Sequence, residues 1–300
     1  MDVEEYTHED IKIVQKIMTN ALTRDNQDEL QEFLKGELSY FRFPQDPLHE
    51  KTLREVSSQS HRELTIKNNA VLRLLAIRDI LKGYVTAYKT ENGGEYLREV
   101  TPKITDQVGS QGAKYLPYHS DMGYLRFSEE TNHANKCRAP DYLALTCIRN
   151  SEKVGTFVLD IDIIKEKMGN SFNFLKKNWF SFQSPDSVKP IKKYKSKPIV
   201  FSNNGVDLMR WEKCLPSSLE GAEVYTTLYK LLENIDLGEN IILKPGETLV
   251  FNNRRCLHGR KAIKSLKAVD EPRLLFRVYV NNFPQPAGLP EDELFYRQEG

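Results

Sequence analysis

The chain has 300 residues, which suits one large globular domain or two small ones. Its 43 basic and 42 acidic residues leave a net charge of +1, which gives no support for nucleic-acid binding. No apolar run approaches the roughly 18 residues of a membrane helix, and residues 1–5 lack the basic start of a secretory signal. The four cysteines have no C-x-x-C spacing, so we expect a protein of the reducing cytoplasm.

The N-terminal part of the chain predicts helices. Apolar residues recur at three- and four-residue steps over residues 9–36, where Asp25 and Asn26 are candidate caps of a second helix. Asn68 is the candidate cap of a strongly apolar-faced helix that Gly83 closes.

From Tyr84 onward the pattern changes to short strands. Residues 84–88 and 96–100 flank a turn, Asn92-Gly93-Gly94, and predict a hairpin. A helix is expected at 221–234, and further strands at 141–149, 154–160, about 197–202, 247–252 and 273–281. Helices first and many strands after predict a mostly β fold with flanking helices. We expect a double-stranded β-helix, a cupin-like jelly-roll barrel, with N-terminal helices covering one sheet.

Three residues predict a catalytic metal centre. His119 and Asp121 are separated by one residue, so on a strand both side chains would project to one side. His258 follows a predicted turn and strand, at the expected mouth of the barrel. Two histidines and one carboxylate hold one face of an octahedral Fe(II) ion and leave three positions open. An isolated H-x-D pair or a lone histidine is more often structural, so the prediction rests on their combination.

Two arginines follow the distal histidine. Arg273 and Arg277 are four residues apart in an apolar strand, so both project from one face. Burying a guanidinium without an anion is costly, which favours carboxylate binding over an exposed or ion-paired strand face. The guanidinium fork fits a carboxylate such as the one at the far end of 2-oxoglutarate.

Together these motifs resemble the taurine-dioxygenase superfamily of Fe(II)/2-oxoglutarate-dependent oxygenases. The resemblance is closer to its clavaminate-synthase-like branch, which includes hydroxylases of free amino acids. It covers about residues 80–282 and rests on eight strings: Lys82-Gly83-Tyr84-Val85, Asn92-Gly93-Gly94, Gly109-Ser110-Gln111-Gly112, Tyr118-His119-Ser120-Asp121, Pro140-Asp141-Tyr142-Leu143-Ala144-Leu145, Gly155-Thr156-Phe157-Val158, His258-Gly259-Arg260 and Pro272-Arg273-Leu274-Leu275-Phe276-Arg277-Val278-Tyr279-Val280. Many of the nearest members of that branch have Glu where Asp121 stands.

The resemblance also implies roles for individual residues. Arg273, assisted by Thr156, would hold the distal carboxylate of 2-oxoglutarate. Arg277 would hold the α-carboxylate of the substrate, and Ser110 and Gln111 would contact it.

A lid or insert is expected at about residues 169–216. Asp207 and Glu212 lie in it and are acids that could meet a cationic side chain, although ordinary surface charges are an equally good reading of each. The expected organisation is a single oxygenase domain over 1–300. It has a helical cover over 1–83, a jelly-roll core over 84–282 and a tail over 283–300.

The predicted reaction is Fe(II)- and 2-oxoglutarate-dependent hydroxylation, using O2, of an unactivated C–H of a small substrate, with release of succinate and CO2. A free L-amino acid is the expected substrate, with basic ones such as lysine or arginine among the candidates. Two alternatives stay open. One is desaturation, cyclisation or isonitrile-type oxidation of another small metabolite by the same cofactors, and the other is a non-catalytic cupin-like binding protein. No nucleic acid or membrane is expected as a partner, and the sequence indicates no oligomeric state.

Overall fold

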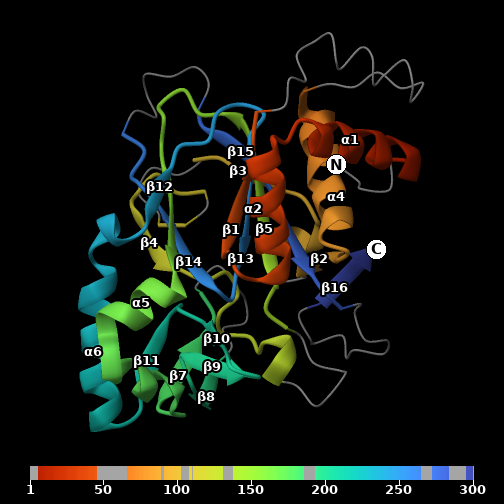
Figure 1. Cartoon of the computed structure of the whole chain (residues 1–300). Coiled ribbons are helices and arrows are strands. Elements are labelled where there is room, and N and C mark those ends of the chain that lie inside the picture. Colours follow the sequence, from red (N-terminus) through yellow and green to blue (C-terminus); the bar gives the residue numbers. More distant parts are fainter. Residues whose placement is uncertain are drawn as a thin grey trace.

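The structure is a computed structural model and describes residues 6–45, 66–88, 91–102, 108–109, 111–130, 138–185, 193–264, 272–283 and 295–299. Within these ranges, a seven-stranded and a four-stranded sheet are accompanied by two smaller sheets and by helices (Figure 1). The expected mostly β fold with flanking helices is confirmed at this level.

The largest sheet joins strands from distant parts of the chain. Its order is β1-β13-β5-β15-β2-β16, with β3 also paired to β15, and all its pairs are antiparallel. Its strands are β1 (Tyr40–Phe43), β2 (Tyr84–Tyr88), β3 (Arg98–Val100), β5 (Tyr142–Arg149), β13 (Thr248–Asn252), β15 (Leu274–Asn281) and β16 (Phe295–Glu299). The second sheet has the order β12-β6-β14-β4 and consists of β4 (Leu116–His119), β6 (Thr156–Asp160), β12 (Glu239–Ile241) and β14 (Cys256–Arg260).

Alternate residues of the large sheet face two different apolar cores. On β15, Leu275 and Tyr279 belong to one buried cluster, whereas Phe276 and Val278 belong to another. This is the period-2 alternation of a strand that is covered on both faces. The first cluster also contains residues of the second sheet such as Leu257, so it fills the space between the two sheets.

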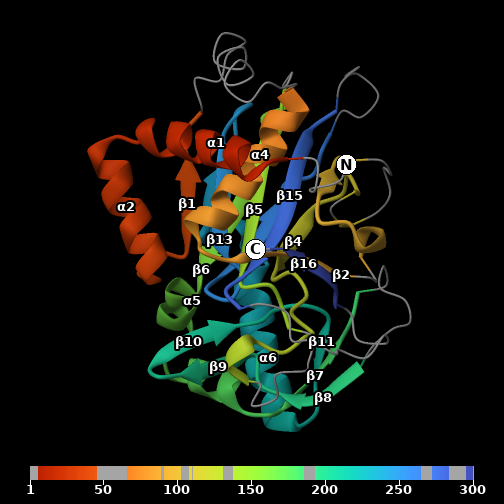
Figure 2. The ribbon, with the colours of Figure 1, turned by 90° about the vertical axis from the view of Figure 1, so that its right-hand side faces the viewer.

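N-terminal helices cover the other face of the large sheet, as expected (Figure 2). They are α1 (His8–Asn20), α2 (Arg24–Lys35) and α4 (Ile66–Ile80). Buried residues on each of them, such as Val14, Phe33 and Leu74, join Phe276 and Val278 in the second cluster. None of the described helices is both long enough and apolar enough to cross a bilayer.

Two predicted helix caps were wrong. The N-cap of α2 is Thr23, whose hydroxyl accepts a hydrogen bond from the Asn26 N–H, so Asp25 lies inside the first turn. In the first turn, the negative charge of Asp25 stabilises the helix through its dipole, but the side chain does not cap the helix. Asn68 lies within α4, which begins two residues earlier. Gly83 does close α4, because its N–H donates to a carbonyl in the last turn of that helix.

The predicted hairpin of residues 84–88 and 96–100 was also wrong. Both β2 and β3 pair with β15, β2 beside residues 279–281 and β3 beside residues 275–277. The two strands therefore lie end to end along one partner instead of side by side. The turn residues form the short helix η2 (Asn92–Gly94). A local turn signal does not reveal that both flanking strands pair with a third strand.

A separate layer of short elements lies below the two main sheets in Figure 1. Two small sheets in it have the orders β10-β9 and β11-β7-β8. The elements are α5 (Ile161–Met168), η4 (Gly169–Lys176), β7 (Phe180–Gln183), β8 (Lys193–Lys197), β9 (Val200–Asn203), β10 (Val206–Met209), β11 (Cys214–Pro216) and α6 (Leu219–Leu232). This layer contains the described part of the insert expected at about 169–216. The helix expected at 221–234 is α6.

Gly259 sets how closely β14 approaches β4. A Cβ added at Gly259 would lie 2.8 Å from the Leu116 carbonyl oxygen and 3.2 Å from the Pro117 carbonyl carbon. Both are backbone atoms of the neighbouring strand, so the contact would be relieved only by moving the two strands apart.

We predict that Gly259→Ala lowers the free energy of unfolding by about 1–3 kcal/mol, the usual cost of forcing extra atoms into a packed interior. Urea unfolding followed by circular dichroism measures this. The control is Gly36→Asn, at the C-cap of α2, where φ is +82° and nothing lies within 4 Å of the added Cβ. Asn tolerates left-handed backbone, so the control should cost clearly less. Equal stability of Gly259→Ala and the wild type would contradict the close approach.

Candidate active site

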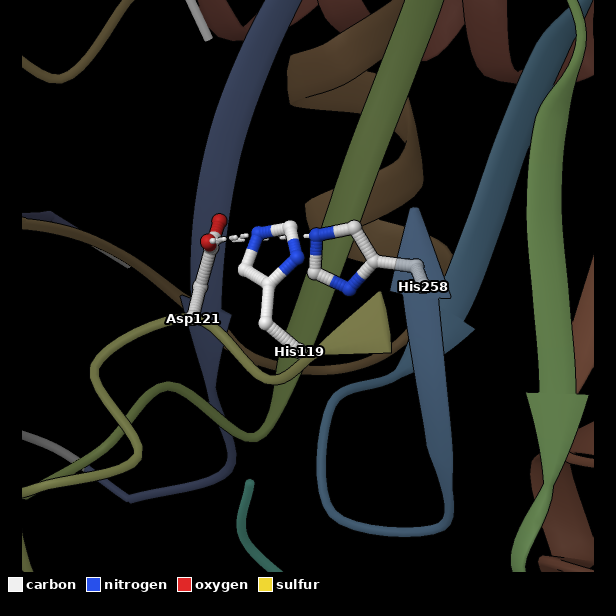
Figure 3. Close-up of side chains that lie close together, drawn as sticks. All are labelled: His119, Asp121 and His258. Atoms are coloured by element: carbon white, nitrogen blue, oxygen red, sulfur yellow. Dashed lines mark ion pairs between the residues drawn. The ribbon is translucent and has the colours of Figure 1, made fainter. Parts of the chain in front are cut away.

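The three predicted metal ligands come together on the second sheet. His119 ends β4 and is paired in register with His258 on β14, and Asp121 lies in the turn that follows β4. The Asp121 Oδ1 atom is 3.4 Å from His119 Nε2 and 3.8 Å from His258 Nε2 (Figure 3). One potential ligand atom from each residue lies within 4.8 Å of the others. The three atoms form a small triangle, as the protein face of an octahedral metal site requires.

The protonation states of the triad also fit a divalent metal. Burial lowers the pKa of His258 to about 3, and His119 adds to this effect, so the imidazole is neutral and keeps a lone pair for a metal. His119 Nδ1 lies 2.9 Å from the Pro117 carbonyl oxygen, to which it donates if Nε2 is the metal-binding nitrogen. Burial opposes ionisation of Asp121, but Arg277 and the two histidines outweigh it and hold the pKa of that carboxyl below its usual range.

The two oxygens of the Asp121 carboxylate have different neighbours. Oδ1 faces the two histidines. Oδ2 accepts hydrogen bonds from Arg277 Nη1 at 3.1 Å and from the Tyr279 hydroxyl at 3.0 Å. Both donors lie on β15, in the large sheet. This arrangement leaves Oδ1 for a metal and fixes the direction in which it points.

The backbone of Asp121 is fixed as well. The Asn253 side chain accepts a hydrogen bond from the Asp121 N–H at 2.9 Å and donates to the Asp121 carbonyl at 2.8 Å. The same amide group donates to the Pro140 carbonyl at 3.1 Å. Asn253 is buried in the turn between β13 and β14, so this clamp connects the two segments that carry the ligands.

Arg277 is held by two carboxylates. Its Nη2 donates to Glu91 Oε1 at 2.7 Å, and its Nη1 donates to Asp121. Arg98 also pairs with Glu91. Burial disfavours the charge on Arg277, but Glu91, Tyr279 and Asp121 raise its pKa above the ordinary value. The Nε of Arg277 is buried with no hydrogen-bond partner in the described part of the chain.

Arg273 is buried in a different environment. Its Nη2 donates to the Thr156 hydroxyl at 3.1 Å, which places together the two residues predicted to act together. Among the described residues, the Nε of Arg273 has no hydrogen-bond partner and no carboxylate pairs with this guanidinium. Burial, with the neighbouring Arg260, lowers the pKa of Arg273 to about 10, so it remains a cation at neutral pH. A buried cation without an acidic partner is costly unless it receives an anionic ligand.

One large cavity connects these groups. Its volume is about 1010 Å³, and it is lined by the metal triad, by Arg273 with Thr156, and by Arg277 with Tyr279. Volumes of 300 to 1,000 Å³ are usual for small-molecule sites. The triad and both predicted arginines therefore share one cavity.

Glu212 also lines this cavity. Its carboxylate accepts hydrogen bonds from the backbone N–H groups of Gly123 and Tyr124, whereas its Oε2 is buried without a partner in the described structure. Burial and the nearby Asp121 carboxylate raise the pKa of Glu212 well above its usual value. Glu212 therefore lines the cavity, and its contact with a substrate stays a prediction.

The structure does not bring Asp207 to the cavity. Asp207 lies on β10, and its carboxylate pairs with Lys165 Nζ at 3.0 Å and with Lys176 Nζ at 2.8 Å. Ser202 donates a further hydrogen bond to it. Because a lysine of α5 and a lysine of η4 already neutralise this acid, we correct the prediction that it contacts a substrate.

The remaining predicted substrate contacts are Ser110 and Gln111. Ser110 is outside the described residues. Gln111 is half-buried in a turn and does not line the cavity. The same turn is fastened by Arg260, which donates hydrogen bonds to the carbonyls of Gly109 and Gly112. Arg260 is therefore a structural arginine here, although it also lines the cavity.

Sequence reasoning missed several groups of the site. Tyr279 could have been found, because it follows Arg277 by two residues and so shares its face of β15. Glu91 and Asn253 carried no such signal, since their roles depend on contacts between distant segments.

Comparisons with solved structures support the fold. No protein-family model and no curated protein sequence matches the chain. An asparagine oxygenase in complex with Fe(II), 2S,3S-3-hydroxyasparagine and succinate is similar with a TM-score of 0.67 and 17% identity, over 92% of each chain. The non-heme iron oxygenase OrfP in complex with Fe and alpha-ketoglutaric acid is similar with a TM-score of 0.64 and 16% identity, over 92% of this chain and 93% of that one. OrfP in complex with Fe, succinate and (3S)-hydroxy-L-Arg has a TM-score of 0.66 and 17% identity, over 93% of each chain. At these identities the likeness establishes that the chain has the fold of these non-heme iron oxygenases.

We predict that the wild-type chain binds one Fe(II) ion and that His119→Ala, Asp121→Ala and His258→Ala each abolish stoichiometric binding. Tyr279→Phe removes one of the two donors to Oδ2 and should weaken binding about tenfold, as is typical when a group that orients a metal ligand is lost. Anaerobic equilibrium dialysis followed by metal analysis measures both effects. His8→Ala, at an exposed histidine of α1, is the control. Full metal occupancy in any of the three ligand variants would refute the triad.

Proposed function

We propose that this chain is an Fe(II)- and 2-oxoglutarate-dependent oxygenase of the taurine-dioxygenase superfamily, in its clavaminate-synthase-like branch. It hydroxylates an unactivated C–H of a free L-amino acid and releases succinate and CO2. The observation that carries this proposal is the pairing of two features in one cavity. These are a His-His-Asp triad and, at Arg273, a buried guanidinium without an acidic partner among the described residues.

Arg273 and Thr156 are suited to the distal carboxylate of 2-oxoglutarate. A guanidinium offers parallel donors to a carboxylate, and the unpartnered Nε of Arg273 remains available as one of them. The Thr156 hydroxyl is already oriented by its hydrogen bond to Arg273. The OrfP complex with Fe and alpha-ketoglutaric acid has the same fold, which supports this choice of co-substrate.

The triad is suited to Fe(II). An Fe(II) centre with 2-oxoglutarate and O2 supplies oxidative decarboxylation of the co-substrate coupled to oxidation of the substrate. The chain contributes the imidazoles of His119 and His258, of which His258 is neutral, and one carboxylate oxygen from Asp121. Arg277 and Tyr279 keep the second carboxylate oxygen occupied, so that Asp121 offers one ligand atom and not two.

The other end of the cavity is suited to a free amino acid. Arg277 lies next to the triad and would exchange Glu91 for the α-carboxylate of the substrate. The released Glu91 carboxylate would then be available to the α-ammonium group. Glu212 offers one unpartnered oxygen to a polar or basic side chain. The solved structures with 3-hydroxyasparagine and hydroxy-L-Arg support this substrate class.

We further propose that the seven- and four-stranded sheets are the two sheets of a double-stranded β-helix within one oxygenase domain over 1–300. In this proposal residues 1–83 cover the core of 84–282, and the insert at about 169–216 is its lid. A cytoplasmic location remains a prediction from the sequence.

We predict that the Fe(II)-loaded protein consumes 2-oxoglutarate and O2 faster when a suitable L-amino acid is present. A screen of the twenty amino acids measures succinate release and, by mass spectrometry, a gain of one oxygen atom in the amino acid. Asp121→Ala is the inactive control. A product that has lost two hydrogen atoms and gained no oxygen would show that the reaction is desaturation or cyclisation and not hydroxylation. If no small molecule led to release of succinate, the remaining alternative would be a non-catalytic binding protein.

We predict that Arg273→Lys raises the KM for 2-oxoglutarate at least about tenfold, because an ammonium group does not reproduce the guanidinium fork. The matched control is Arg255→Lys, since Arg255 pairs with Asp162 and does not line the cavity. Succinate release at varied 2-oxoglutarate measures the KM. An unchanged KM would mean that another cation of the cavity binds the distal carboxylate of 2-oxoglutarate.

A further inference from the structure

The outer part of the cavity is built from aromatic and apolar side chains. Trp211, Tyr225 and Tyr229 line it, together with Val108, Pro185 and Leu215. The ring centroids of Trp211 and Tyr225 are 5.4 Å apart, and those of Tyr225 and Tyr229 are 6.1 Å apart. We call these three residues the aromatic wall. It begins at a buried tryptophan and ends at Tyr229, which is 49% exposed.

The inner end of the aromatic wall is fixed to the metal site. The Trp211 N–H donates to the Ser120 hydroxyl at 3.0 Å, and the Ser120 N–H donates to the Trp211 carbonyl at 2.8 Å. Ser120 stands between the two ligands His119 and Asp121. Trp211 is therefore held in a defined position relative to the metal ligands.

The outer end of the wall is carried by α6. Tyr225 and Tyr229 are four residues apart and so lie on one face of that helix. The adjoining stripe of α6 packs into the core through Val224, Leu228 and Leu232, and Tyr225 also packs against that core. The helix thus holds two ring side chains towards the cavity while its other residues anchor it.

The cavity has more room than a compact amino acid needs. A cavity of about 150 Å³ accommodates one benzene ring, so 2-oxoglutarate and asparagine, with about twenty non-hydrogen atoms together, require roughly 500 Å³. The cavity of about 1010 Å³ is about twice that size. The additional space is bordered by the aromatic wall.

The outer part of the cavity is less charged than the inner part. Glu91, Asp121 and Glu212 lie towards the triad and the arginines, where Glu91 and Asp121 are already paired with Arg277. The aromatic wall and its neighbours Val108, Pro185 and Leu215 contain no charged side chain themselves, and Lys213 lines the cavity beside them. Apolar and aromatic contacts are thus what this surface offers a ligand.

We propose that the aromatic wall is a substrate subsite and that the physiological substrate is an amino acid with an aromatic group in its side chain. The inference rests on the proposed function, since the amino acid end is placed at Arg277. It changes the expected class from small or basic amino acids to aromatic ones. The aromatic side chain would extend from the metal site along Trp211 towards Tyr229.

The test compares binding of L-phenylalanine and L-homophenylalanine with that of L-lysine and L-arginine. The Fe(II)-loaded protein with 2-oxoglutarate is titrated without O2 in a calorimeter. The chain has two tryptophans, so in a Trp179→Phe background the emission of Trp211 reports a ligand at the wall. We expect the aromatic amino acids to bind at least about fivefold more tightly than the basic ones and to change this emission.

Variants then locate the bound ring. Tyr225→Ala and Tyr229→Ala should each weaken binding of L-phenylalanine about fivefold to tenfold, and Tyr229→Phe should restore it because it keeps the ring. Leu219→Ala is the control, because Leu219 is 84% exposed on α6 and does not line the cavity.

The outcomes separate the inference from the function on which it rests. Tighter binding and turnover of lysine or arginine, with no effect of the two Ala variants on phenylalanine, would overturn the aromatic subsite and leave the oxygenase intact. Absence of succinate release with every amino acid, together with absence of binding, would overturn both.

Discussion

The site depends on one carboxylate that joins the two main sheets. Asp121 belongs to the segment that follows β4 of the second sheet, and its Oδ1 faces the two histidines of that sheet. Its Oδ2 is bound by Arg277 and Tyr279 of the large sheet. The separation of the sheets therefore fixes where the ligand atom lies. The core between the sheets, which contains Leu257 and Leu275, maintains that separation.

Around β15, charged and apolar side chains point to opposite faces of the large sheet. Arg273 and Arg277 project into the cavity, whereas the intervening Phe276 packs against the N-terminal helices. The apolar face stabilises the sheet, and the charged face contributes ligand-binding groups that are costly to bury. Two guanidinium groups in one cavity repel each other unless anions are present. Glu91 and Asp121 compensate the charge of Arg277, and Arg273 is left for a ligand.

Sequence patterns predicted what depends on short-range periodicity. The strands at 141–149, 247–252 and 273–281 and the helices at the N-terminus are present, and His119, Asp121 and His258 do come together. The patterns failed where pairing joins distant segments. The strands β2 and β3 were expected to pair with each other, but β15 accepts both. Asp207 was assigned to the cavity because it lies in the insert, and no local signal indicated that lysines of α5 and η4 would neutralise it.

The double hydrogen bond between Asn253 and the backbone of Asp121 has a consequence for how this site could change in evolution. The backbone of Asp121 and its Oδ2 atom are both held by hydrogen bonds, so the distance between them is fixed. The side chain at this position must have the length that fits this distance. Glutamate is longer by one methylene group, so it would push its carboxylate out of the place between the histidines and β15 unless the Asn253 contact were released. In this chain, the length of the side chain at position 121 is therefore coupled to the turn that carries Asn253.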